Sequence, residues 1–395
     1  MRSVFLRNAL VLGMLSAIGP FAIDMYLPAF PAISRDLQVD VSAVQMSLMS
    51  FFTAVAVCQI VYGPLSDRFG RRPPLFFGLG LFVLGAIGCS FAQSVEALIA
   101  FRFLQGVGSC ATMVIPRAII RDLHTGHEAA RLMATMMLVF SVSPILAPLA
   151  GSFLTEAFGW RVIFWATAAI GLGGLAVVLF LLPETHRPDG TKKSIGQTFG
   201  TYRSLLKDRH FLGLAFIGGF GQASFFSYLA GSSVIFIEHF GLSPSGYSLI
   251  FASNAIAFIG SAQFNSTFMR RFGAPRMVRT AISGFAALTS VLFILTVAGV
   301  EGPYLLWGML FVSFGCLGFV IPSTAVLALE SHGPIAGTAS ALMGTLQLST
   351  GAIIIVLVSA FYDGTSLSMV SAIVACGLIA LTLSLRTLKP KRAYP

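Results

Sequence analysis

The chain has 395 residues, of which 56% are hydrophobic and 10% are charged. Soluble domains carry about a quarter charged residues, so this composition excludes a soluble enzyme, and its hydrophobicity excludes a disordered chain. The net charge of +10 indicates a positive-inside membrane protein and not a nucleic-acid-binding protein, because no soluble segment carries a basic face.

Twelve apolar segments follow one another along the chain, and each is long enough to cross a bilayer as a helix. Their runs of about 20 apolar residues exclude the alternating pattern of a membrane β-barrel. The sequence therefore predicts an all-α membrane protein with twelve transmembrane helices. The expected spans are residues 8–33, 42–65, 74–93, 95–118, 129–152, 161–182, 210–237, 245–268, 276–299, 303–327, 335–360 and 366–386.

The one long polar break, residues 183–209, divides the spans into two sets of six. We expect an N-terminal six-helix bundle at 1–185, a cytoplasmic linker at 186–209 and a C-terminal six-helix bundle at 210–395. With the N-terminus inside, 22 of the 25 Lys and Arg residues fall in inner segments, two in outer segments and one within a span. This bias predicts that both termini are cytoplasmic.

Two charged residues lie deep within the predicted spans, away from the span ends: Asp24 in the first span and Arg102 in the fourth. Their distances from the span ends place both in the outer half of the membrane, roughly 10–14 Å from its surface. A lone charge there costs roughly 2.5–3.5 kcal/mol, so such groups pair or face a cavity. A structural ion pair or snorkelling is one explanation. We favour a functional one, in which Asp24 takes up and releases a proton and Arg102 governs that exchange.

The spans of the second half carry neutral polar groups in place of charges. The seventh span mixes polar and aromatic side chains within two turns, which is typical of a cavity wall for an amphipathic, largely apolar ligand. Ordinary packing or lipid contact is the alternative. The candidate cavity residues are Tyr26, Gln105, Gln222, Phe225, Phe226, Tyr228, Asn254 and Gln347.

Two further motifs mark the first half of the chain. The loop at residues 63–72 combines glycines with Asp67 and three arginines, a composition that fits either a charged clamp or a solvated loop. The fifth span contains Pro144, Pro148 and Gly151. Two prolines four residues apart break backbone hydrogen bonds and bend a helix, and small residues permit close helix contact.

The sequence lacks the usual signals of catalysis. No phosphate-binding loop of the GxxxxGK[ST] type occurs, and no span places a nucleophile beside a base. The five cysteines and six histidines show no metal-ligand spacing. We therefore expect neither an enzyme nor a bound metal or cofactor.

Taken together, these motifs resemble those of the major facilitator superfamily. The loop at 63–72 is similar to the signature between its second and third spans, and Pro144 to Gly151 is similar to its antiporter motif in span five. The matching segments also include Arg102 with Gln105-Gly106-Val107-Gly108 in span four, Pro183-Glu184-Thr185 after span six, and Ile23-Asp24-Met25-Tyr26-Leu27-Pro28 in span one. The last segment resembles the bicyclomycin and chloramphenicol resistance branch of the twelve-span drug/proton antiporters.

This resemblance implies a monomeric drug pump of the bacterial inner membrane, built from two pseudo-symmetric bundles that work by alternating access. It implies that Asp24 is the proton site, tuned by Arg102, and that small amphipathic drugs of the phenicol or bicyclomycin type are exported. It implies no cofactor and no nucleic-acid partner; the partners are the drug, protons and the lipid bilayer. The implied cytoplasmic gate is Gly63, Asp67, Arg68, Gly70, Arg71 and Asp122, and the implied helix bend is Pro144, Pro148 and Gly151.

The chain departs from the family pattern in three places. Ser143 precedes Pro144 where a glycine is more common, and the second-half loop at 265–273 has two arginines but no acid. The stretch from Gly13 to Pro20 lacks the second acid of some related antiporters, which favours one proton per cycle.

Two other functions are compatible with the composition. The first is a proton-coupled carrier that imports or exports a small metabolite, although the span-five prolines argue against import. The second is a membrane sensor or structural protein, in which the intramembrane charges would only support the fold.

Overall fold

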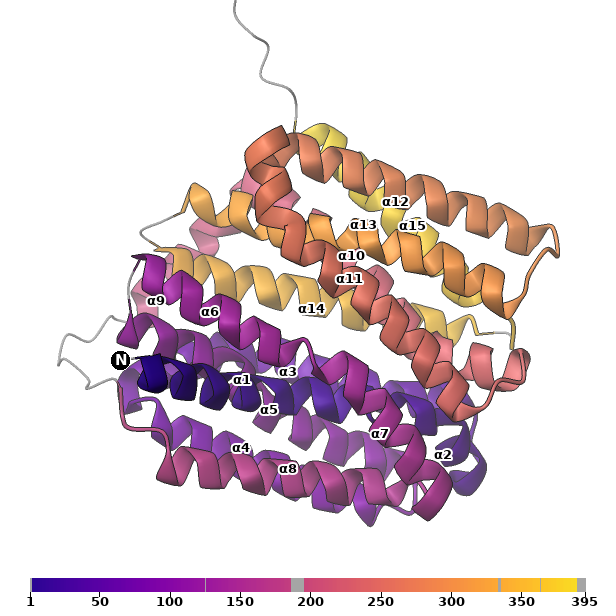
Figure 1. The fold of residues 1–395 in the computed structure, drawn as a ribbon, viewed down its shortest axis with the longest axis horizontal. Coiled ribbons are helices and arrows are strands. Elements are labelled where there is room, and N and C mark those ends of the chain that lie inside the picture. Colours follow the sequence, from indigo (N-terminus) through magenta and orange to yellow (C-terminus); the bar gives the residue numbers. More distant parts are fainter. Residues whose placement is uncertain (1, 125, 186–194, 333–334, 363, 389–395) are drawn as a thin grey trace, which may run out of the picture. The chain divides into compact units, whose positions relative to one another are not determined.

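The computed structural model describes residues 2–124, 126–185, 195–332, 335–362 and 364–388. In these ranges every regular element is a helix, and twelve helical segments are long and apolar enough to cross a membrane (Figure 1), which confirms the predicted fold class. The elements are α1 (Arg2–Asp24), η1 (Leu27–Ala29), α2 (Phe30–Leu37), α3 (Val41–Phe69), α4 (Arg72–Ser90), α5 (Val95–Leu123), α6 (Gly126–Phe140), α7 (Ser143–Phe158), α8 (Arg161–Phe180), α9 (Ile195–Leu205), α10 (Arg209–Val234), η2 (Ile235–His239), α11 (Pro244–Phe272), α12 (Ala274–Val297), α13 (Pro303–Glu330), α14 (Ala336–Ala360) and α15 (Leu367–Thr387).

Two predicted spans are interrupted where the sequence analysis expected single segments. The first span consists of α1, η1 and α2, because Pro28 and Pro31 cannot donate the backbone hydrogen bonds that a continuous helix needs. The fifth span consists of α6 and α7, which are separated at residues 141–142; α7 begins at Ser143, and Pro144 follows in its first turn. The expected proline bend is therefore a break at the N-terminal side of Pro144.

The chain forms two compact units. Unit 1 comprises residues 1–192 together with 241–252, and unit 2 comprises residues 193–240 together with 253–395. The first part of α11 thus belongs to unit 1 and the remainder to unit 2. The division into domains at 1–185, 186–209 and 210–395 stays a prediction, and the linker residues 186–194 lie outside the described part of the chain.

Unit 1 is built around α1 and α5. Helix α1 packs against α5, α6, α7 and α8, while α5 also packs against α3 and α4. Glycines permit these close contacts: a Cβ at Gly106 of α5 would lie 2.5 Å from the Phe51 carbonyl oxygen of α3, and one at Gly85 of α4 would lie 2.6 Å from the Gln105 nitrogen. The backbone on both sides of Gln105 is therefore held by two neighbouring helices.

Unit 2 repeats this arrangement around α10. Helix α10 packs against α13, α14 and α15, and α12 packs against α13 and α15. The short helix α9, which lies in the predicted linker, packs against α14. At its end, α10 continues into the π-helical turn η2.

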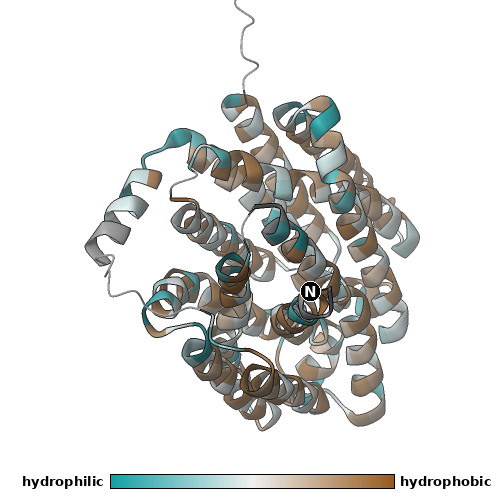
Figure 2. Cartoon of the chain, turned by 60° about the vertical axis from the view of Figure 1, so that its left-hand side comes forward, coloured by the Kyte–Doolittle hydropathy of each residue, from teal (hydrophilic) through white to brown (hydrophobic). Residues whose placement is uncertain are grey.

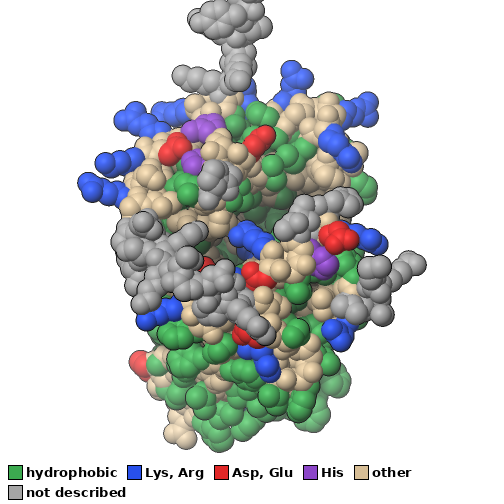
Figure 3. Space-filling view, turned by 90° about the vertical axis from the view of Figure 1, so that its left-hand side faces the viewer, with side chains coloured by type: hydrophobic (Ala, Val, Ile, Leu, Met, Phe, Trp, Pro, Cys, Tyr) green, Lys and Arg blue, Asp and Glu red, His purple; other side chains and the backbone are tan. Residues whose placement is uncertain are grey.

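Polar residues gather at the ends of the helices. In Figure 2 the helix centres are hydrophobic, and hydrophilic residues lie mainly at the helix ends and in the connections. Figure 3 faces the side on which the N-terminus lies, and Lys and Arg side chains are spread over this face with fewer acids. Apolar helix centres with polar ends are typical of a membrane protein.

Candidate functional site

Asp24 lies at the point where the first span is broken. It is the last residue of α1, and the amide of Tyr26 bonds to the Ile23 carbonyl (3.2 Å) where a continued α-helix would use the Ala22 carbonyl. The chain then turns through η1 before α2 begins. The break leaves the backbone carbonyl of Ala22 available to another donor.

Arg102 of α5 donates a hydrogen bond to this carbonyl. Its Nη1 donates to the Ala22 oxygen (3.2 Å) and to Oε1 of Gln105 (2.7 Å). The guanidinium carbon lies 4.5 Å from the ring centroid of Tyr26 and 4.6 Å from that of Phe51. A cation bonded to the last carbonyls of a helix stabilises that helix end, and the two rings offer further electrostatic contact. Arg102 therefore acts as a C-terminal cap of α1.

Asp24 and Arg102 do not form the ion pair that their predicted depths suggested as one explanation. Both side chains are buried, and among the described residues the Asp24 carboxyl group has neither a hydrogen bond nor an ion pair. The Nε and Nη2 atoms of Arg102 are buried without a hydrogen-bond partner. A buried carboxyl without partners is far less costly when it is protonated, because an isolated charge loses its hydration.

The predicted cavity residues of the first half are held within unit 1. Tyr26 is fully buried, and its hydroxyl lies 2.6 Å from Oγ of Ser47. Gln105 is also fully buried, and its Nε2 donates to Thr167 at 3.5 Å in addition to the contact with Arg102. Both therefore take part in the polar contacts around Arg102.

The proline- and glycine-containing segment of α7 packs directly on the break in the first span. A Cβ at Gly151 would collide with the backbone carbonyl of Met25, the residue after Asp24. Pro144 stands at the start of α7 and Pro148 lies inside it. Gly151 is thus the residue that lets α7 approach the broken segment.

A second polar cluster surrounds Arg71, between α3 and α4. Its Nη1 donates to Asp67 (2.6 Å) and Ser66 (2.8 Å), and its Nε donates to Asp122 (2.7 Å). Burial alone would lower the pKa of the Arg71 guanidinium, but the bonds to Asp122 and Asp67 outweigh burial and raise it. The predicted gate residues Asp67, Arg71 and Asp122 are therefore brought together.

The other predicted gate residues have different surroundings. Gly70 adopts a φ of 87°, a conformation that glycine tolerates best. Arg68 lies over the ring of Phe69, 5.3 Å from its centroid. A side chain at Gly63 would meet nothing within 4 Å.

The sequence analysis did not assign Glu184 to the gate. Its carboxylate accepts hydrogen bonds from the backbone amides of Arg71 (2.8 Å) and Arg72 (3.0 Å), at the N-terminus of α4. An acid at this end of a helix pairs with the free amides and with the helix dipole. The Pro-Glu-Thr segment was the available signal, but sequence alone does not show which helix end it reaches.

Unit 2 brings three predicted cavity residues together. Nδ2 of Asn254 donates to the Tyr228 hydroxyl (2.9 Å), and Asn254 Oδ1 is buried without a partner. Phe225 stacks on Phe258, and both Phe225 and Tyr228 meet the ring of Phe314, with centroid distances of 5.1–5.5 Å. Phe258 and Phe314 were not predicted, because their helices are distant in sequence.

The remaining predicted residues of unit 2 lie elsewhere on α10 and on the neighbouring helix α14. Phe226 packs against α14, where a Cβ at Gly351 would collide with its ring. Gln347 lies beside Gly218, and its Nε2 is buried without a partner. Gln222 is half-buried on α10.

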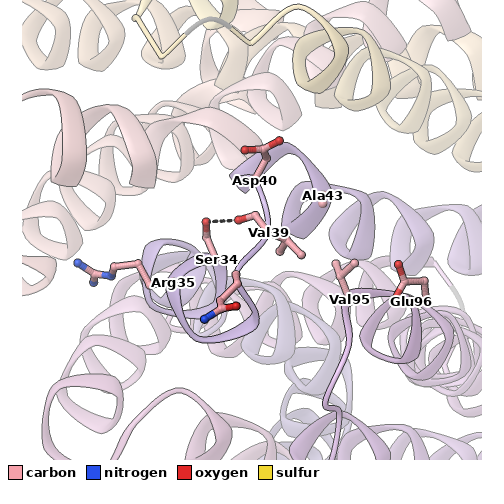
Figure 4. Close-up of a pocket in the computed structure, with 8 residues that line it drawn as sticks. Ser34, Arg35, Val39, Asp40, Ala43, Val95 and Glu96 are labelled. Carbon is pink, nitrogen blue, oxygen red and sulfur yellow. Dashed lines mark hydrogen bonds between the residues drawn. The ribbon is translucent and has the colours of Figure 1, made fainter.

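A solvent-open recess lies apart from these clusters. It has a volume of about 640 Å³ and is formed by α2, the turn into α3 and the start of α5 (Figure 4). None of the predicted site residues lines it. The lining residues are Ser34, Arg35, Gln38, Val39, Asp40, Ala43, Val95 and Glu96.

Comparison with known families agrees with this geometry. The sequence profile of the Major Facilitator Superfamily matches residues 12–355. The chain belongs to the major facilitator superfamily. This is a family of transporters and not of enzymes, so the chain is a multi-pass protein of the bacterial inner membrane that carries small molecules.

Relatives include proteins named for drug resistance. An MFS-type transporter of Bacillus subtilis, YdgK, is 36% identical over 353 residues (88% of this chain, 87% of the relative). A bicyclomycin resistance protein homolog of Haemophilus influenzae is 32% identical over 379 residues (94% of each chain). A chloramphenicol resistance protein of Pseudomonas aeruginosa is 29% identical over 362 residues (88% and 83%). These similarities agree with the predicted drug antiporter branch.

A solved structure supports the fold independently of sequence. The crystal structure of a point mutant of the nucleoside transporter NupG superposes with a TM-score of 0.76 over 97% of this chain and 98% of that chain. The sequence identity is 14%, so this similarity concerns the fold alone.

Proposed function

We propose that the protein exports small amphipathic drugs, of the phenicol or bicyclomycin type, in exchange for protons by alternating access. The observation that carries the proposal is Asp24, a buried acid without an ion-pair partner at a break in the first span. The drug-resistance names of two relatives support the substrate class. We further propose cytoplasmic termini and a monomer.

In this proposal Asp24 is the proton site and Arg102 governs it through the end of α1. Arg102 holds the Ala22 carbonyl, two residues before Asp24. When Asp24 loses its proton, the new carboxylate attracts the unpaired Nε and Nη2 atoms of Arg102. Such a pairing would pull on the cap of α1, and it thereby couples the proton to the conformation of the broken span.

The drug is proposed to bind beside the aromatic residues of unit 2. Phe225, Phe258 and Phe314 present apolar rings, while Asn254 Oδ1 is an acceptor without a partner. This combination fits a largely apolar ligand that has a hydrogen-bond donor. Gln222, Phe226, Tyr228 and Gln347 complete the proposed cavity set of unit 2, and Tyr26 and Gln105 are the proposed cavity residues of unit 1.

Two clusters of unit 1 complete the proposed transport cycle. The contacts of Arg71 with Asp67 and Asp122 form the proposed cytoplasmic gate, to which we add Glu184. Gly151 lets α7 approach the broken first span, and Pro144 and Pro148 form the proposed bend of the same span. Movement of α7 would therefore displace the backbone next to Asp24.

One proton per cycle limits the gradient that the protein can build. A pH unit supplies about 1.4 kcal/mol and a charge that crosses 100 mV supplies about 2.3 kcal/mol. Export of a neutral drug uses both, roughly 3.7 kcal/mol, which corresponds to a gradient of a few hundredfold. A monovalent cationic drug uses only the pH difference and reaches about tenfold. Neutral drugs are the favoured substrates.

The test follows proton release from inside-out membrane vesicles with an acidified lumen. Chloramphenicol, bicyclomycin and a lipophilic cation are added separately while the pH gradient is recorded. We expect at least one neutral compound to dissipate the gradient in wild type and not in Asp24→Asn at equal expression. Asp40→Asn, an acid outside the proposed site, serves as the matched control and should behave as wild type.

Each other outcome has a definite meaning. Equal dissipation by wild type and Asp24→Asn would leave transport standing and remove Asp24 as the proton site. No response to any compound would contradict drug/proton exchange. Equal accumulation ratios for neutral and cationic drugs would contradict the single-proton arithmetic.

A further inference from the structure

Inward from Asp24, the seam between α1 and α5 carries buried polar atoms without partners. Arg102, Gln105 and Ser109 share one face of α5, because they are three and four residues apart. Among the described residues, Arg102 Nε and Nη2 have no hydrogen-bond partner, and neither does Ser109 Oγ. Arg102 and Ser109 are both 0% exposed. Orphaned polar atoms at this depth call for a polar ligand, because each costs free energy when it is left unpaired.

Ser109 lies directly against α1. A Cβ at Gly19 would lie 2.5 Å from Ser109 Oγ, so the absence of a side chain at Gly19 makes room for the hydroxyl. Gly19 precedes Asp24 by five residues, or roughly 7.5 Å along the helix axis. Ser109 is thus the next polar group on α5 after the residues that surround Arg102.

The backbone of α1 supplies an acceptor at the same place. Pro20 lies inside α1 and has no N–H, so the Ser16 carbonyl lacks the donor that a regular helix provides. Ser16 lies one turn before Gly19 on the same face. The hydroxyl of Thr112 bonds to the Ser109 carbonyl (2.8 Å), so polar groups continue along α5.

We propose that internal water occupies this seam and that Ser109 relays the proton of Asp24 along it, away from the break in the first span. The Ser109 hydroxyl and the Ser16 carbonyl offer two polar partners to one water, and the Arg102 donors, seven residues away on α5, offer partners to another. Protonated Asp24 gives its proton to a water, that water gives a proton to Ser109 Oγ, and Ser109 releases its own proton to the next water. One proton leaves Asp24 as a carboxylate, and Ser109 ends unchanged.

This path rests on the proposed function only in taking Asp24 as the proton site, so the test does not use a drug. The full-length protein is reconstituted in liposomes and mixed rapidly with D₂O. Infrared spectroscopy follows the exchange of the protonated Asp24 carboxyl, identified as the carbonyl band that Asp24→Asn removes. We expect Ser109→Ala to slow this exchange about tenfold, less than the roughly hundredfold of a directly positioned proton-transfer group, because a second water partly replaces the hydroxyl.

A second variant and a control keep the test independent of folding. Gly19→Ala places a methyl group against Ser109 Oγ and should also slow the exchange. Ser90→Ala removes a buried hydroxyl of α4 that bonds within its own helix (2.7 Å) and should exchange as wild type does. Wild-type exchange in Ser109→Ala or in Gly19→Ala overturns the path.

The failure of the path is distinct from the failure of drug export. Slow exchange in Ser109→Ala together with no drug response in vesicles would leave the path standing and reject drug coupling. Drug-linked proton release together with wild-type exchange in Ser109→Ala would support drug export and reject the path. A wild-type protein without the Asp24 band would remove both the path and the proposed proton site.

Discussion

The two units share a helix arrangement but differ in the chemistry that they bury. In unit 1, α1 contacts α5, α7 and α8; in unit 2, the corresponding helix α10 contacts α13, α14 and α15. The seam of α1 and α5 buries Asp24 and Arg102, whereas unit 2 buries the neutral pair Tyr228 and Asn254. Helix packing depends on small and apolar residues, so the two units can keep one architecture while their polar residues diverge.

The loops after the second helix of each half show the same difference. Gly70 and Gly273 both adopt positive φ values, 87° and 79°, so both turns use the same backbone device. Around Gly70 lie Arg71, Asp122 and Glu184, whereas a Cβ at Gly273 would meet nothing within 4 Å. The comparison indicates that the turn serves the fold and that the ion cluster is a separate addition.

The largest expected effect concerns the glycines that face the first helix of each unit. Gly151→Ala should lower the free energy of unfolding by about 3 kcal/mol, because its methyl group meets the fixed carbonyl of Met25. Gly351→Ala should cost less, about 1 kcal/mol, since its contact is with the side chain of Phe226 and not with backbone. Thermal unfolding in detergent measures both. Equal losses would mean that the contact of Gly151 with the Met25 backbone relaxes as readily as the contact of Gly351 with the Phe226 side chain.

The next effect compares the arginines of the two loops. Arg71→Ala should cost about 2 kcal/mol, because it removes charged hydrogen bonds to Asp67 and Asp122. Arg271→Ala should change stability by less than about 0.5 kcal/mol, since within the described part of the chain Arg271 forms no ion pair and lies over the ring of Phe272. Chemical unfolding of both variants gives the comparison. A comparable loss in Arg271→Ala would show that the second loop is also held by its charge.

Buried tyrosines give a smaller difference. Tyr228→Phe should cost about 1 kcal/mol, because Nδ2 of Asn254 is left without its partner. Tyr26→Phe should cost less, since Ser47 still donates to the Val44 carbonyl (2.7 Å). The measurement is the unfolding midpoint of each variant. A larger loss for Tyr26→Phe would assign the stronger polar network to unit 1.

The smallest effect concerns pH and the N-terminus of α10. Burial alone would raise the pKa of Asp208, but its bonds from the Phe211 and His210 amides and its contact with His332 lower it. A lowered folded pKa gives stability that is complete above the unfolded value, about 3.9, and is lost as pH falls through the folded value. Asp208→Asn keeps a capping residue and should lose only about 0.3–1 kcal/mol at neutral pH.

The measurement for Asp208 is the unfolding midpoint between neutral and acid pH. The difference between wild type and Asp208→Asn should shrink as pH falls below about 4 and vanish once Asp208 is protonated. A constant difference at all pH values would mean that the charge of Asp208 does not stabilise α10.

Much of the fold could be predicted from the chain, and less of the site. The twelve spans followed from the length of the apolar runs, and the family followed from short motifs such as residues 63–72. The break at Asp24 could have been predicted, because Pro28 and Pro31 cannot donate helical hydrogen bonds. The continuous apolar run instead led to the prediction of a single uninterrupted span. The capping of α1 by Arg102 and of α4 by Glu184 was not predictable, because each joins helices distant in sequence.

The sequence by itself determined that this is a twelve-helix membrane protein of a transporter family, with one acid and one arginine deep in its first half. That follows because hydrocarbon demands apolar helices and makes every buried charge conspicuous. The tertiary structure alone decided the partners: Arg102 at the Ala22 carbonyl, Ser109 against Gly19, and Phe258 and Phe314 beside Phe225. Partners depend on which helix faces meet, and helices of nearly uniform apolarity do not specify their neighbours until they pack.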